Sequence, residues 1–153
     1  MKIIVTAAIA AMAIVLNFSY PPSSIAGKVS IAALPVFSID DLLDAIEQVE
    51  SNGNPNAIGD DGNAIGSFQI WESYVDDVNR ILGKKKYSYQ DRLDSCLSRQ
   101  MTKTYISHYA IEKRLHHKPT HQDMARIHNG GPNGYRKKST EIYWGKIKKE
   151  LLR

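Results

Sequence analysis

Three carboxylates close together in the sequence could act on a glycosidic bond. Glu50 comes first, and Asp60 and Asp61 follow within a loop rich in glycine and asparagine at residues 54–63. Cleaving a glycosidic bond needs one carboxylic acid to protonate the leaving oxygen, and a second carboxylate often stabilises or captures the oxocarbenium-like carbon. Glu50 with Asp60 or Asp61 could supply that pair. Because neighbouring carboxylates repel each other, we expect one of the two aspartates to point to solvent.

These residues also have structural interpretations. Glu50 could be an exposed glutamate at the end of a helix, and either aspartate could stabilise its own turn by hydrogen bonds to the backbone. The Gly53-Asn54-Pro55 turn favours a functional role for Glu50, because the loop that it begins lays backbone donors and acceptors along a cleft. Sugar hydroxyl and N-acetyl groups could bind there.

Two more segments carry polar side chains suited to a cleft. Gln69 lies between Phe68 and Ile70, so its amide could bind a sugar, brace the loop backbone, or do both. His128 and Asn129 precede Gly-Gly-Pro, which predicts a tight turn, and they should face whatever that turn faces. The alternative is that the glycines only stop a helix and that His128 is structural.

Helical periodicity predicts the element that positions Glu50. Ser38 and Asp41 have the spacing of a capping box, and apolar residues then recur at helical spacing as far as Val49. Gly53 is the predicted C-cap, so Glu50 falls in the last turn of this helix.

Further helices are predicted at residues 74–82, 88–115, 120–130 and 140–151. Gly83 ends the first of them, Ser88 with Asp91 caps the second, and Thr120 with Asp123 caps the third. Strand patterns are scarce, and residues 68–70 could form a short strand or the start of a helix. These patterns indicate a mainly α fold, a small helical domain with a loop or short β element beside the cleft.

The N-terminus has the pattern of a secretory signal. Lys2 precedes an apolar run at residues 3–16, and residues 24–26 (Ser-Ile-Ala) form a small-residue cleavage pattern. A weaker pattern lies at residue 32 or 33, and an uncleaved membrane anchor is the alternative. We predict secretion to the extracellular space or the periplasm. The expected divisions are a signal peptide at residues 1–26, a linker at 27–37 and one domain at 38–153.

The charge balance favours a polyanionic partner. Lys and Arg total 20 against 16 Asp and Glu, which gives a net charge of +4, and most of the excess lies in residues 136–153. A basic exported protein suits an anionic bacterial cell wall, although this stretch could equally be a solvated helix face. The sequence contains no motif typical of nucleic-acid binding, so we expect no nucleic-acid partner.

A single cysteine excludes disulfide bonds within the chain. Cys96 lies in an apolar helical pattern, so we expect a buried structural thiol, with an intermolecular bridge as the alternative. The histidines show no spacing typical of a metal site. Cys-x-x-Cys, His-Glu-x-x-His and phosphate-binding glycine motifs are absent from the sequence. We therefore expect no metal and no cofactor.

Residues 124–134 (Met-Ala-Arg-Ile-His-Asn-Gly-Gly-Pro-Asn-Gly), followed by Tyr143-Trp144, closely resemble a signature of invertebrate-type (destabilase-like) lysozymes. Glu50-Ser51 and residues 66–70 (Gly-Ser-Phe-Gln-Ile) resemble catalytic segments of the same family. Residues 54–60 look as much like soluble lytic transglycosylases.

This resemblance implies a lysozyme-like fold and cleavage of the β-1,4 bond between N-acetylmuramic acid and N-acetylglucosamine. It implies that Glu50 is the proton donor and that Asp60 or Asp61 is the catalytic aspartate, with Asp60 favoured by its Gly-Asp position. The residues that match sugar-contacting or cleft-supporting positions are Ser67, Gln69, His128 and Asn129. That family is rich in cysteine, and this chain has one, so its stability must come from packing.

We therefore predict a secreted, antimicrobial (bacteriolytic) peptidoglycan muramidase. It should act as a monomer, without stable membrane association after signal cleavage. A lytic transglycosylase that uses the same Glu50 is the nearest alternative, and it would leave 1,6-anhydro ends in its products. The alternative from another class is a non-catalytic peptidoglycan- or chitin-binding protein.

Overall fold

Helix α1 (Ile39–Ser51) opens the part of the chain that the computed structural model describes, residues 36–153. The Asp41 amide donates to the Ser38 hydroxyl (3.1 Å), and the Ser38 amide donates to the Asp41 carboxylate (2.7 Å). The predicted capping box is therefore confirmed. The predicted signal peptide, and the linker as far as residue 35, lie outside the described residues.

The C-terminal end of α1 differs from the prediction by one residue. Asn52 is the C-cap, with a left-handed φ of 54°, and Gly53 follows it with a φ of 75°. Asparagine adopts this conformation more readily than most residues, so the helix ends before the glycine. Glu50 nevertheless lies in the last turn of α1, as predicted.

The short β element next to the cleft is a hairpin. Strand β1 (Ile58–Gly59) pairs antiparallel with β2 (Ala64–Ile65), and the short 3-10 helix η1 (Asp60–Gly62) makes the turn between them. Ile65 also forms an isolated bridge with Ile70, which closes the loop behind the hairpin. Residues 68–70 thus form neither a regular strand nor a helix start.

Two helices were predicted between residues 72 and 115. The first is confirmed, and the second is divided into shorter elements. Helix α2 (Glu72–Leu82) ends at Gly83 as expected. The predicted helix over residues 88–115 is wrong, because the Ser88 capping box opens only the 3-10 helix η2 (Tyr89–Leu93). The chain then forms α3 (Ser95–Tyr109) and, after a break, the short helix α4 (Glu112–Leu115). The break lets Ala110 and Leu115 both pack into the core.

The C-terminal third forms the remaining elements. Helix α5 (His121–Gly130) carries the predicted Thr120–Asp123 capping box. The 3-10 helices η3 (Gly134–Arg136) and η4 (Lys138–Thr140) lead into α6 (Glu141–Leu151), close to its predicted bounds.

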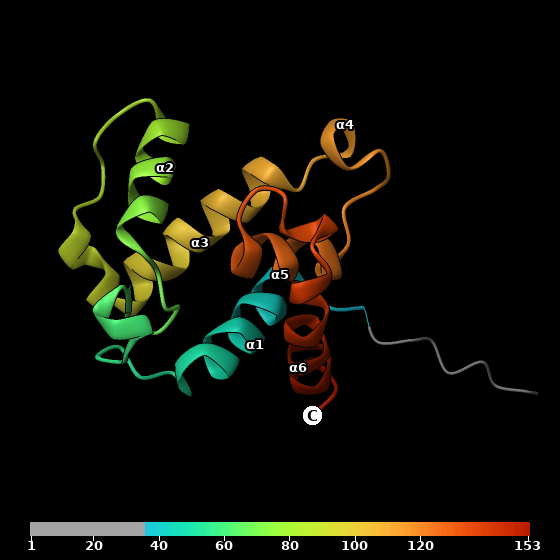
Figure 1. Ribbon diagram of the computed structural model, residues 1–153, viewed down its shortest axis with the longest axis horizontal. Helices are drawn as coiled ribbons and strands as arrows, with labels where there is room; N and C mark the ends of the chain where they lie inside the picture. Colours follow the sequence, from blue (N-terminus) through green and yellow to red (C-terminus); the bar gives the residue numbers. More distant parts are fainter. Residues whose placement is uncertain (1–35) are drawn as a thin grey trace, which may run out of the picture. The chain divides into compact units, whose positions relative to one another are not determined.

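Figure 1 shows how the helices of residues 36–153 are arranged, and their buried apolar side chains form one core. Helix α5 contacts α1, α3 and α6, while α1 also packs on α6 and α2 packs on α3. The largest fully buried side chains include Leu42, Ile46, Phe68, Met101, Ile106, Ile127 and Ile147. Because the helices that carry Glu50 and His128 share this core, the distance between those two side chains is fixed by packing.

The prediction of a buried thiol is wrong, because Cys96 is exposed. It lies in the first turn of α3, where its neighbour Leu97 takes the position that packs against the core. Among residues 36–153, no helix has the length and apolar character needed to span a membrane.

Candidate active site

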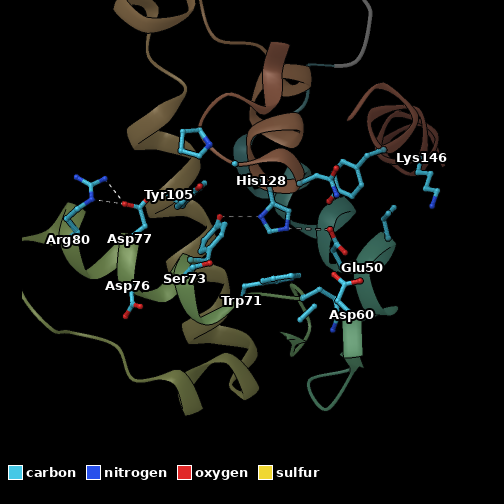
Figure 2. A pocket seen from close by; sticks show the side chains of 18 residues that line it. Glu50, Asp60, Trp71, Ser73, Asp76, Asp77, Arg80, Tyr105, His128 and Lys146 are labelled. Carbon is cyan, nitrogen blue, oxygen red and sulfur yellow. Dashed lines mark hydrogen bonds and ion pairs between the residues drawn. The ribbon is translucent and has the colours of Figure 1, made fainter. Parts of the chain in front are cut away.

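One cavity of about 930 Å³ gathers most of the residues that the sequence singled out (Figure 2). Its walls come from α1, the hairpin, α2, α3, α5 and α6. The predicted site residues that line it are Glu50, Asp60, Gln69, His128 and Asn129. Asp61 and Ser67 do not line it.

Glu50 reaches the cavity from the last turn of α1. Its side chain is 18% exposed, and its Oε1 atom lies 3.5 Å from Nε2 of His128 on α5 (Figure 2). The other ring nitrogen of His128, Nδ1, lies 3.3 Å from the Tyr74 hydroxyl on α2. The row of three side chains fixes the direction of the Glu50 carboxyl group while leaving it access to the cavity. A general acid needs this combination of orientation and access.

Tyr143 of α6 places a buried hydroxyl near Glu50. By distance and angle, this hydroxyl has no hydrogen-bond partner among residues 36–153. Burial, together with the charge of nearby Glu50, raises the pKa of Tyr143 well above its ordinary value. The hydroxyl therefore stays protonated, and a small shift would let it donate to Glu50 or to a bound sugar.

The hairpin turn presents Asp60 to the cavity, whereas Asp61 is exposed and lies outside it. Both aspartates have left-handed backbone conformations, with φ of 47° and 53°. The Asn63 side-chain amide donates to the Asp60 carbonyl (2.8 Å) and helps to hold this turn. Backbone conformations of this kind cost energy and persist where surrounding contacts enforce them, often at functional sites.

Gln69 supports the loop that carries Asp60. Its side-chain amide donates to the carbonyls of Ala57 (3.2 Å) and Gly66 (2.9 Å). A Cβ atom at Gly59 would collide with Oε1 of Gln69, so a larger residue there would displace this amide. Since Gln69 also lines the cavity, it can both brace the loop and face a ligand.

Ser67 lies behind the cavity wall. Its side chain is fully buried, and its carbonyl accepts a hydrogen bond of 2.9 Å from the Ser51 hydroxyl. A direct sugar contact at Ser67 does not fit this position, because no part of the side chain reaches the cavity. The supporting role does fit, since the bond ties the end of α1 to the loop that follows the hairpin.

Arg92, which the sequence did not single out, holds the hairpin loop from behind. It is 5% exposed and donates to the carbonyls of Tyr89 (2.7 Å), Ile70 (3.2 Å) and Asn63 (3.3 Å). Its guanidinium also lies 3.3 Å from the Glu72 carboxylate. One buried side chain thus connects η2, the hairpin loop and the start of α2, and nothing in the local sequence around residue 92 indicates this.

On the Glu50 side of the cavity, Trp71 is the main lining residue that the sequence did not single out. It is 45% exposed, which is high for a residue with so large an apolar surface. An exposed aromatic ring in a cavity wall offers a flat apolar face to a ligand. Its position directly after the Gln69-Ile70 pair could have suggested this role.

The opposite end of the cavity contains a second charged group. The Arg80 guanidinium donates to the Asp77 carboxylate (2.7 Å) and to the Tyr109 hydroxyl (2.8 Å), and that hydroxyl donates to Asp77. Burial and the hydrogen bond to Asp77 raise the pKa of Tyr109. Within residues 36–153, no group of three His, Cys, Asp or Glu side chains is placed to hold a metal ion.

Comparisons with known proteins bear on the family and the fold. Residues 40–150 match the sequence model of the family described as Destabilase. The structure is similar to a chain in the crystal structure of PliI from Aeromonas hydrophila in complex with lysozyme from Meretrix lusoria. The TM-score is 0.60 at 29% sequence identity, and the match covers 71% of this chain and 87% of the other. No curated protein matches the chain.

Proposed function

Because the chain belongs to the destabilase family, that of the invertebrate-type lysozymes, we propose that it is a peptidoglycan muramidase. It hydrolyses the β-1,4 bond between N-acetylmuramic acid and N-acetylglucosamine. The observation that carries this proposal is that Glu50 and Asp60, from a helix end and a hairpin turn, line one cavity large enough for a saccharide.

In the proposed reaction, Glu50 protonates the glycosidic oxygen as the bond to the anomeric carbon breaks. His128 and Tyr74 orient the Glu50 carboxyl group through the contacts described above. Asp60 stabilises or attacks the anomeric carbon, and a water molecule completes the hydrolysis. We choose Asp60 over Asp61 because only Asp60 lines the cavity.

Three other lining residues suit sugar binding. The exposed ring of Trp71 can stack on the apolar face of a pyranose, and Asn129 and Gln69 carry amides that can bond with hydroxyl and N-acetyl groups. The proposal extends to location: residues 1–26 direct export, so that the domain meets cell-wall peptidoglycan outside the cytoplasm.

The test is digestion of purified peptidoglycan by the mature chain, by Glu50→Gln and by the control Glu47→Gln, with products identified by mass spectrometry. Glu47 lies on the same helix, but its carboxylate faces Arg99 at 3.9 Å instead of the cavity. We expect reducing muramic ends from the wild type and from Glu47→Gln, and none from Glu50→Gln.

Other products would change the assignment. Anhydro ends that also depend on Glu50 would identify a lytic transglycosylase. If the wild type and both variants bind peptidoglycan without releasing products, the protein is a non-catalytic binding protein and the muramidase proposal fails.

A further inference from the structure

The cavity continues beyond the two carboxylates to a second group of lining residues, which we call the far arm. These residues are Asp76, Asp77, Arg80, Tyr105, Gly131 and Pro132. Figure 2 shows Arg80, Asp77 and Asp76 on the opposite side of the cavity from Glu50 and Asp60, with His128 between the two groups. Cleavage of a single glycosidic bond does not require this additional length.

Charges in the far arm are held in place. Arg80 and Asp77 form an ion pair at 2.6 Å, and the Tyr109 hydroxyl bonds to both of them. The Tyr89 hydroxyl donates to Asp76 (3.0 Å). The opposite wall is also fixed, because Arg114 donates to the Pro132 carbonyl (2.8 Å). The far arm is therefore organised before any ligand arrives.

Tyr105 supplies an unused polar group to this arm. It is 4% exposed, stacks on Tyr74 with 3.8 Å between ring centroids, and lines the cavity. Its hydroxyl would lie 3.9 Å from a Cβ at Gly131 and forms no hydrogen bond with any other residue of the described range 36–153. Burial, together with the charge of Asp77, raises the pKa of Tyr105, so the hydroxyl stays a neutral donor. Because Tyr105 lines the cavity, this hydroxyl can donate to a ligand there.

The charges of the far arm suit a charged ligand better than a neutral sugar. A plain N-acetylglucosamine polymer offers hydroxyl and amide groups that can hydrogen-bond to Asp76 and Arg80, but it brings no opposite charge to either of them. Peptidoglycan differs in that the lactyl group of each muramic acid carries a peptide stem. Such a stem presents free carboxylates, amide carbonyls and, at a diamino acid residue, a primary ammonium.

From these observations we propose that the far arm binds the peptide stem of a muramic acid whose glycan lies along the Glu50 end. Arg80 binds a stem carboxylate, Asp76 binds an ammonium group, and the Tyr105 hydroxyl donates to a stem carbonyl. This inference rests on the proposed function for its substrate. It adds that the cavity selects peptide-bearing peptidoglycan over peptide-free glycan and over chitin.

Equilibrium binding tests the proposal without depending on catalysis. Two soluble probes, a muramic acid-containing disaccharide with a tetrapeptide stem and the same disaccharide without it, are titrated against the mature chain by calorimetry. The Kd should be several-fold lower for the peptide-bearing probe. Tyr105→Phe should weaken binding of that probe about fivefold, as expected for one lost hydrogen bond, and should affect the bare disaccharide less.

Arg80→Gln should also reduce the preference, and the preference of the wild type should decrease with added salt. Tyr87→Phe is the matched control, because Tyr87 is 3% exposed and its hydroxyl faces Gln100 outside this cavity. It should change neither Kd. Equal affinity of the wild type for both probes, or a preference that survives both far-arm variants, would overturn the inference. Absence of cleavage with an intact preference would instead remove only the muramidase proposal.

Discussion

The two ends of the cavity hold their carboxylates in different ways. In the far arm, Asp77 is bonded to the Arg80 guanidinium and to the Tyr109 hydroxyl. At the other end, Glu50 has one ion-pair contact within the described residues, with His128 at 3.5 Å, and Asp60 has none there. A carboxylate bonded to a cation and a hydroxyl is held in one orientation. A carboxylate with one long contact keeps its oxygens free for a ligand.

In the proposed function, this difference separates two roles within one cavity. Glu50 is the proposed proton donor, and it is oriented by His128 but keeps oxygens free for a ligand. The far arm is the proposed binding region, and hydrogen bonds hold its charged groups in place. The predictions below either break this separation or make it sharper.

The largest expected effect distinguishes the two adjacent aspartates of the hairpin turn. Asp60→Asn should lower kcat on peptidoglycan about a hundredfold, because a charge that faces the reacting carbon is lost. Asp61→Asn is the matched control, since asparagine tolerates the same left-handed backbone and Asp61 lies outside the cavity. It should change kcat less than about twofold. Equal losses in the two variants would contradict the choice of Asp60.

A second prediction concerns the support of the reactive end. Arg92→Leu should reduce the free energy of unfolding by about 2–3 kcal/mol, because the carbonyls of Ile70 and Asn63 lose their buried donor. Urea denaturation measures this loss. Because the hairpin loop then moves, kcat should fall as well.

Arg99→Leu is the control for Arg92→Leu. Arg99 also makes several ion pairs, but they lie on the surface between α1 and α3, with Asp40 and Asp44 among its partners. Its loss should cost about 1 kcal/mol or less and leave kcat intact. If both variants lose the same stability with unchanged kcat, Arg92 does not position the site.

The contrast between the two ends of the cavity can also be measured as a difference in the free energy of unfolding. Asp77→Asn should lower the free energy of unfolding by about 1 kcal/mol, because its bonds to Arg80 and Tyr109 weaken. Glu50→Gln should change it by less than that, or raise it slightly, because Glu50 has few partners to lose. Paired urea titrations decide this. A larger loss in Glu50→Gln than in Asp77→Asn would reverse the comparison.

The smallest predicted effect concerns Asp123, a carboxylate outside the cavity. Like Asp77, it accepts hydrogen bonds from more than one side chain. Burial opposes ionisation of Asp123, but hydrogen bonds from Thr120 and His117 outweigh burial and lower its pKa. Its folded pKa thus lies below the unfolded value of about 3.9. The resulting stability is present above that value and is lost as the pH falls through the folded pKa.

Thr120→Ala removes one of those partners of Asp123. The stability difference from wild type should therefore be larger at about pH 5 than at about pH 2, as measured by thermal denaturation. Thr104→Ala is the control, because its hydroxyl bonds only within α3, to the Gln100 carbonyl. The same difference at both pH values would show that Asp123 does not contribute through its charge.

Local sequence determined the elements that depend on nearby residues. The capping boxes at Ser38 and Thr120 were predictable because their hydrogen bonds span three residues. The position of Glu50 in the last turn of α1 followed from the same periodicity. The family was also readable from the sequence, because the segment from His128 to Pro132 and the segment around Gln69 are contiguous motifs.

Only the tertiary structure decided which side chains meet in the cavity. The sequence left Asp60 and Asp61 as alternatives, since both are adjacent turn residues. Their directions depend on the left-handed turn and on the contacts of distant Arg92 with the hairpin loop. The sequence likewise left open whether Ser67 contacts a sugar or supports the cleft, and packing buries its side chain.

The far arm shows most clearly that contacts between distant residues could not be predicted from the sequence. Asp77 and Arg80 lie one turn apart on α2, but Tyr105 comes from α3 and Gly131 from the turn after α5. Their meeting depends on how α2 and α5 pack on α3, which is set by long-range burial of apolar side chains. Bonds within one turn can be read from a sequence, whereas contacts across a core require the fold.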